Sequence, residues 1–214
     1  MSVIAPAVLT ETLDEFRIAT EALQPFARRV HIDVSDGEFA PIFLLTESQL
    51  FWPETWEVDI HAMVARPSEH LAQFVQLKPS MIIFHAESQE DLLPHIEYLK
   101  QVGIKAGVAL LRTTVPSTVA QYIQAVDHVM IFSGDLGKHG GTASMMQVEK
   151  IRLVKKINPN VEIGWDGGVN LENAYTLSQG GVDVLNVGGT IAKSENPTET
   201  YNELVKEINK HGVI

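Results

Sequence analysis

The sequence predicts an α/β protein, a single (β/α)8 TIM barrel that spans residues 1–214 as one domain. Eight short apolar segments alternate with helical patterns, at about the 25-residue spacing of one strand–helix unit. The apolar segments are nearly continuous rather than alternating, which is typical of parallel strands covered on both faces. The 214 residues suffice for a closed barrel, and no repeat, linker or low-complexity stretch indicates a second domain.

In the first half of the chain, strands are short apolar runs and helices carry apolar residues at helical spacing. The run Thr10-Glu11-Thr12-Leu13-Asp14 offers hydroxyl caps and early acidic residues, which predict a helix start. The stretch 37–52 is irregular and rich in aromatic residues. The predicted elements are strand 3–9, helix 10–25, strand 29–34, strand 56–61, helix 67–77, strand 81–85 and helix 89–102.

The second half continues the alternation of strands and helices, with glycines that mark where elements end. A glycine-rich loop at 133–141 interrupts it, and Gly180-Gly181 ends one of the helices. The predicted elements are strand 104–110, helix 117–125, strand 127–132, helix 143–157, strand 161–165, helix 171–179, strand 182–187 and helix 198–210.

Composition and charge exclude several classes of protein. The chain is 45% hydrophobic and carries a net charge of −11, so we expect no nucleic-acid partner and no anionic membrane. The absence of cysteine excludes disulfides and thiolate chemistry and suits a reducing compartment. The N-terminus lacks a signal-peptide pattern, and no apolar run reaches the length of a membrane span. We therefore expect a soluble, cytoplasmic protein.

Reactive side chains collect where the predicted strands end, which is the active-site face of such a barrel. His31 and Asp33 are two residues apart, so their side chains point to the same face of the second strand. His61 ends the third strand, and Asp166 follows the seventh. Two imidazoles and two carboxylates suit one divalent ion such as zinc, iron, manganese or cobalt, whereas magnesium prefers oxygen ligands alone. The alternative is a buried network of paired histidines and aspartates that stabilises the barrel.

One further histidine, His85, also ends a predicted strand, the fourth, and so lies at the mouth. The other histidines do not lie at strand ends. We interpret the remaining five as surface or structural residues: His70, His95, His128, His139 and His211. Of these, His139 is the best candidate for a functional role, because its loop faces the same mouth.

Two glycine pairs follow the last two strands, where barrels of this kind bind phosphate. Gly167 and Gly168 follow the seventh strand, and Gly188 and Gly189 follow the eighth. Glycines let backbone N–H groups approach an anion closely, although such pairs also make ordinary turns. The loop 133–141 could close over a substrate as a lid or could be a mobile surface loop.

Several motifs resemble one known family. HIDVSDGEFAP, from His31 to Pro41, resembles the HIDVMDGxFVP signature of ribulose-phosphate 3-epimerases, and DIHAMV, from Asp59 to Val64, resembles their DVHLMV segment. Four shorter motifs fall in the family's order and spacing. They are HAE (85–87), GVAL (107–110), DGGVN (166–170) and GVD (181–183).

The resemblance implies a ribulose-phosphate-binding barrel that epimerises a ketose phosphate at carbon 3 through an enediolate. His31, Asp33, His61 and Asp166 match the family's metal ligands, and the two aspartates also match its acid/base pair. Met63 matches a methionine that packs near the reacting carbons. We expect Gly167, Gly168, Gly188 and Gly189 to hold the phosphate, with Gly140 and Gly141 closing from the side. A homo-oligomer is also expected.

The chain departs from the family pattern at positions that would face the substrate. These are Ala7 for a serine, Ser35 for a methionine, Leu111-Arg112 for an asparagine, the loop 133–141 for PGFGGQ, and Gly188-Gly189 for a Gly-Ser pair. These changes affect the expected identity of the sugar more than the expected type of reaction. Ribulose 5-phosphate and a ketohexose 6-phosphate are both compatible with the sequence.

Two alternative functions stay open. One is a related sugar-phosphate aldolase or decarboxylase, whose Asp-x-Lys-x-x-Asp lysine is missing here. The other is a non-catalytic sugar-phosphate-binding barrel.

Overall fold

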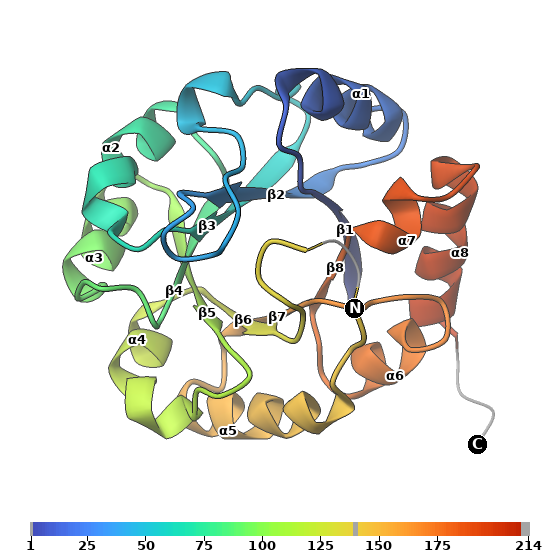
Figure 1. Ribbon diagram of the computed structural model, residues 1–214. Coiled ribbons are helices and arrows are strands. Elements are labelled where there is room, and N and C mark those ends of the chain that lie inside the picture. The colour runs from blue at the N-terminus through green and yellow to red at the C-terminus, as the bar shows by residue number, and fades with distance from the viewer. Residues whose placement is uncertain (1, 139–140, 211–214) are drawn as a thin grey trace.

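The eight predicted strands form one closed parallel barrel in a computed structural model that describes residues 2–138 and 141–210. Each strand pairs with the next along the chain, and β8 closes the ring by pairing with β1, while the helices surround the ring (Figure 1). The strands are β1 (Val3–Val8), β2 (Arg29–Ser35), β3 (Glu57–Met63), β4 (Met81–His85), β5 (Lys105–Leu110), β6 (His128–Phe132), β7 (Glu162–Asp166) and β8 (Val184–Val187).

The helices agree with the predicted pattern in order, and differ mainly where they begin. The α-helices are α1 (Leu13–Leu23), α2 (Pro67–Gln76), α3 (Leu93–Gln101), α4 (Ala120–Ala125), α5 (Glu149–Ile157), α6 (Ala174–Gln179), α7 (Gly189–Ala192) and α8 (Pro197–Ile208). Short 3₁₀ turns, Pro116–Val119 and Met145–Val148, directly precede α4 and α5. The four-residue helix α7 was not predicted.

The predicted start of α1 is confirmed at the level of single hydrogen bonds. The Thr12 hydroxyl accepts a hydrogen bond from the Glu15 N–H, and the Glu15 carboxylate accepts one from the Thr12 N–H. This reciprocal capping box satisfies two N–H groups that a helix start otherwise leaves unpaired.

No helix in the described part of the chain is both long and apolar enough to cross a bilayer.

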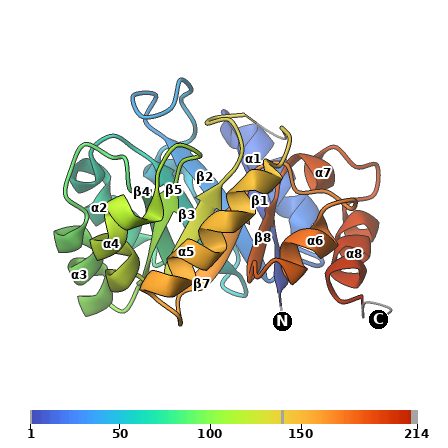
Figure 2. The ribbon, with the colours of Figure 1, turned by 90° about the horizontal axis from the view of Figure 1, so that it is seen from below.

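The two faces of each strand have different surroundings. On β2, Val30, Ile32 and Val34 belong to the main apolar core between the barrel and its helices, while His31 and Asp33 belong to a polar cluster on the opposite face. This is the alternation expected of an extended strand. The loops that follow the strands rise at the top of the side view, and the N-terminal end of the described chain lies at the bottom (Figure 2).

An ion-pair network closes the barrel at the end opposite these loops. Arg29 begins β2, and its guanidinium donates to Asp59 at 2.6 Å and to both carboxylate oxygens of Glu162 at 2.8 Å. The His128 imidazole nitrogen Nδ1 lies 2.7 Å from Glu162 as well. Burial alone would raise the pKa of Glu162, but the hydrogen bonds from Arg29 and His128 hold that pKa well below its ordinary value. This end of a TIM barrel contributes stability rather than chemistry.

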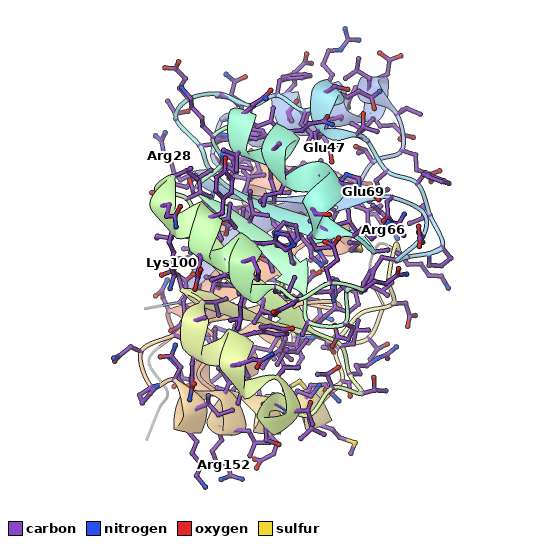
Figure 3. The ribbon with its side chains drawn as sticks, turned by 90° about the vertical axis from the view of Figure 1, so that its left-hand side faces the viewer. Arg28, Glu47, Arg66, Glu69, Lys100 and Arg152 are labelled. Carbon is purple, nitrogen blue, oxygen red and sulfur yellow. The ribbon has the colours of Figure 1, made fainter. Side chains whose placement is uncertain are left out.

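Replacing Arg29 by methionine is expected to lower the free energy of unfolding by about 3 kcal/mol, because it leaves Asp59 and Glu162 partly buried without their cation. Urea unfolding measures the change. Arg28 is the matched control, since it is exposed and directly precedes Arg29. Figure 3 shows it on the side opposite Arg66, which follows β3 at the end where the loops rise. Arg28→Met should change stability by less than about 0.5 kcal/mol. Equal effects of the two substitutions would contradict a stabilising role for the network.

Candidate active site

Four residues from three strands converge at the carboxyl end of the barrel. His31 and Asp33 come from β2, His61 from β3, and Asp166 from the end of β7. Each offers one ligand atom, and these four atoms all lie within 4.8 Å of one another. The sequence predicted this set, and the structure brings all four of its members together.

The contacts within the cluster centre on the carboxylate of Asp33. Its oxygen Oδ1 lies 2.7 Å from His61 Nδ1 and 3.5 Å from His31 Nε2. Asp166 Oδ2 lies 4.0 Å from the same His61 nitrogen. Both imidazoles are fully buried, so the cluster lies at the base of the mouth rather than on the surface.

His31 provides the test of whether these residues fit a metal ion. Its two ring nitrogens are buried, and neither makes a hydrogen bond within the described residues. A buried imidazole without a hydrogen bond is costly, and a cation beside Nε2, between it and the Asp33 carboxylate 3.5 Å away, would remove that cost. Two imidazole nitrogens and two carboxylate oxygens within one small space are the donors that first-row divalent ions prefer. The residues therefore fit a divalent ion.

The two carboxyl groups of the cluster differ in their electrostatic surroundings. Burial would raise the pKa of Asp33, but the adjacent His31 and His61 outweigh it and hold that pKa well below its ordinary value. Burial, and after it the negative charge of Asp33, raises the pKa of Asp166. Such a pair, with the two pKa values moved apart, is typical of acid/base sites.

His85, at the end of β4, contacts the cluster through His61, although the predicted ligand set omitted it. Its Nε2 lies 2.8 Å from His61 Nε2, and its Nδ1 lies 3.4 Å from the Glu87 carboxylate. Glu87 in turn accepts hydrogen bonds from the Leu111 N–H, at 3.0 Å, and from the Thr114 hydroxyl. Burial lowers the pKa of His85 to about 4. This chain of contacts fixes the orientation of the His61 ring.

A pocket opens above the cluster and is lined by every predicted substrate-binding residue that the structure describes, although Ser35, Leu111 and Arg112, also expected to face the substrate, do not line it. Its empty space is about 620 Å³, counting the part open to solvent. Asp33 and Asp166 line it together with Met63, which is buried at the end of β3. Gly140 and His139 lie outside the described residues. The other predicted substrate-binding glycines all line the pocket: Gly141, Gly167, Gly168, Gly188 and Gly189.

Two glycines after β7 allow a close approach of neighbouring loops. Gly167 has φ +102°, and a Cβ added there would lie 2.1 Å from the Gly134 nitrogen. Gly168 has φ +72°, and its added Cβ would lie 2.2 Å from the Ala143 nitrogen. Only glycine permits both the left-handed backbone and these contacts. The glycine-rich loop after β6 is therefore packed directly against the wall of the pocket, while its motion as a lid stays a prediction.

The departures from the family pattern have different structural surroundings. Ser35 lies outside the residues that line the pocket, and its hydroxyl donates at 2.8 Å to the Ile42 carbonyl, which holds the loop after β2. The carbonyls of Leu111 and Arg112 accept hydrogen bonds from Lys150, at 2.6 and 3.0 Å. Ala7, in contrast, lines the pocket directly.

The histidines interpreted as surface or structural residues lie away from the cluster wherever they are described. His70 pairs with Glu47, His95 lies 3.2 Å from Glu90, and His128 belongs to the network at the other end of the barrel. His211 lies outside the described residues.

Comparison with known proteins identifies relatives over most of the chain. The family model described as the ribulose-phosphate 3 epimerase family matches residues 3–192. A ribulose-phosphate 3-epimerase of Helicobacter pylori is 30% identical over 205 residues, covering 90% of this chain and 92% of the relative. A chloroplastic ribulose-5-phosphate-3-epimerase of Arabidopsis thaliana is 28% identical over 218 residues, covering 96% of this chain and 75% of the relative.

Solved structures that resemble the fold are more distant in sequence. A 3-hexulose-6-phosphate synthase from Salmonella typhimurium has a TM-score of 0.71 at 14% identity, with 98% of this chain and 100% of the other covered. The protein KGPDC from Streptococcus mutans has a TM-score of 0.72 at 12% identity, with 97% of each chain covered. At these identities the similarity confirms the barrel fold alone.

Proposed function

The chain belongs to the ribulose-phosphate 3-epimerase family, a family of isomerases that act on carbohydrates, and from this premise we propose that it inverts carbon 3 of a ketose phosphate. The substrate we propose is D-ribulose 5-phosphate, which gives D-xylulose 5-phosphate. The alternative substrate is a close analogue such as a ketohexose 6-phosphate. The observation that carries the proposal is that Asp33 and Asp166 line one pocket from β2 and β7, two strands separated in the ring by β8 and β1.

The two aspartates act as the acid/base pair. One carboxylate removes the proton from carbon 3, and the other, on the opposite face of the resulting planar enediolate, delivers a proton and inverts the centre. A single base would tend to return its proton to the same face. Met63, buried against the same pocket, packs near the reacting carbons and helps to exclude water from them.

His31, Asp33, His61 and Asp166 are the residues that would hold a divalent ion. When bound, such an ion supplies positive charge that stabilises the enediolate and makes the proton on carbon 3 acidic enough for a carboxylate to remove. The contact from His85 orients His61 for this role. The identity of the ion, zinc, iron, manganese or cobalt, stays a prediction, as do the homo-oligomer and the cytoplasmic location.

The phosphate is held by the backbone of the two glycine pairs, Gly167-Gly168 and Gly188-Gly189, with Gly141 at the side. Two or three hydrogen bonds to a charged phosphate contribute about 4 kcal/mol in total. We therefore expect kcat/KM for unphosphorylated ribulose to be roughly a thousandfold lower than for ribulose 5-phosphate. Steady-state kinetics with both sugars measure the ratio, and a ratio near one would exclude a phosphate anchor at these glycines.

Product analysis tests the proposed reaction against its alternatives. The purified protein, loaded in turn with each of the four ions, is incubated with five- and six-carbon ketose phosphates, and NMR identifies the products. Epimers at carbon 3 support the proposal. Shorter sugars would indicate the aldolase instead. Carbon dioxide released from a sugar phosphate that carries a keto acid, assayed in parallel, would indicate the decarboxylase. Unchanged sugars that nevertheless bind would indicate a binding protein.

A further inference from the structure

Asn186 is a buried amide in the active-site pocket to which neither the sequence motifs nor the proposed reaction assigns a role. It is only 2% exposed, and it lines the same pocket as Asp33 and Asp166. Its Nδ2 donates to the sulfur of Met130 at 3.3 Å, and sulfur is a weak acceptor. Its Oδ1 is buried and has no hydrogen-bond partner within the described residues. An unpaired buried carbonyl oxygen costs free energy that a bound donor would recover.

The position of Asn186 relates it to one part of the proposed substrate. It is the direct neighbour of Asp166 in the pairing of β7 with β8, and it precedes Gly188 by two residues. It therefore lies between Asp166 on one side and the glycines proposed to bind the phosphate on the other. In a ketose 5-phosphate, the hydroxyl group between carbon 3 and the phosphate-bearing carbon 5 is that of carbon 4.

On the side of β1, no polar side chain that the structure describes competes with Asn186. β1 pairs with β8 through Ala5 and Asn186, and Ala7 brings only a methyl group to the pocket. Of the pocket-lining side chains that β1 and β8 contribute within the described residues, Asn186 alone is polar. Asp166 on β7 is assigned to proton transfer, so a hydroxyl on the β8 and β1 side of the pocket would find its side-chain acceptor at Asn186.

We propose that Asn186 is a specificity-determining residue whose amide oxygen accepts a hydrogen bond from the carbon-4 hydroxyl of the ketose phosphate. This inference rests on the proposed epimerase function and adds the part of the sugar that the pocket recognises. The alternative is that the amide only fills space beside Met130 in the barrel interior.

The test crosses one substitution with one change in the substrate. Asn186→Leu keeps the number and branching of side-chain heavy atoms but removes the acceptor. The substrates are D-ribulose 5-phosphate and its 4-deoxy analogue, and the readout is kcat/KM for epimerisation of each. We expect Asn186→Leu to lose about tenfold to hundredfold on ribulose 5-phosphate and less than about threefold on the 4-deoxy analogue. The wild-type protein should itself prefer ribulose 5-phosphate by a similar factor.

Met130→Leu is the matched control, because it removes the sulfur that contacts Asn186 and leaves the amide in place. It should affect both substrates equally. An equal loss on both substrates in Asn186→Leu, or a wild-type protein that does not distinguish them, would overturn the inference. If Asn186→Leu does not fold, Asn186→Val, whose side chain suits a strand, carries the same comparison. Wild-type protein that epimerises neither sugar would overturn the proposed function itself, which is a separate result.

Discussion

Replacing Asp166 by asparagine is expected to lower epimerisation by about a thousandfold or more, while the fold and most of the ion binding remain. The amide has the shape of the carboxylate but cannot take up or deliver the proton, and acid/base groups of this kind contribute about 10²- to 10⁴-fold each. Three other predicted ligands, His31, Asp33 and His61, would still surround the ion. Epimerisation is measured by NMR, the fold by thermal unfolding, and the ion by metal analysis.

Deuterium exchange in the same variant separates the two proton transfers. With Asp166 replaced, Asp33 can still exchange the carbon-3 proton of whichever epimer presents that proton to its side. Asp166→Asn is therefore expected to exchange deuterium into one epimer only, and Asp33→Asn into the other only, with neither variant interconverting them. Normal turnover by either variant would exclude the scheme with two opposed carboxylates.

Replacing His31 by leucine is expected to abolish stabilisation by the divalent ion without destabilising the ion-free protein. An ion present at 100 times its dissociation constant should stabilise the wild-type protein by about 2.7 kcal/mol. The variant should gain almost nothing, because leucine offers no ligand atom in place of the imidazole nitrogen, whereas the Asp166→Asn substitution keeps an amide oxygen at the site. Without the ion, His31→Leu should differ little in stability from wild type, since the buried imidazole makes no hydrogen bond within the described residues and its nearest carboxylate contact, Asp33, is 3.5 Å away. Thermal unfolding with and without the ion, after treatment with a chelator, measures both effects.

His128→Gln is the matched control for this comparison. His128 is also buried, but it pairs with Glu162 at the opposite end of the barrel. Its replacement should lower stability with and without the ion by the same amount, so that the effect of the ion is retained. A full stabilising effect of the ion in His31→Leu would show that His31 is not a ligand.

The architecture could be predicted from sequence because strand and helix signals agreed along the whole chain. Continuous apolar runs such as Met81–His85 identify buried parallel strands, and all eight of these strands form. The helix α7 could not be predicted, because Gly189–Ala192 is too short to show helical periodicity. The late starts of α4 and α5 reflect local 3₁₀ hydrogen bonding, which the apolar pattern does not distinguish from an α-helix.

The site was predictable where function depends on spacing within one strand, and less so where it depends on pairing between strands. His31 and Asp33 share a face because they are two residues apart. The contact of His85 with His61 depends instead on the register of β3 and β4, which the sequence does not reveal. Asn186 gave no signal, since one amide in an apolar strand is commonly read as a structural residue, and only the closed ring places it beside Asp166.

Anomalous X-ray scattering from crystals grown with manganese or zinc would locate the divalent ion directly. We expect one strong peak within bonding distance, about 2.0 to 2.3 Å, of atoms from His31, Asp33, His61 and Asp166. In crystals that also hold a ketose phosphate, we expect Asp33 and Asp166 on opposite sides of the sugar. No peak at these residues, with the ion bound elsewhere, would exclude the proposed ion site.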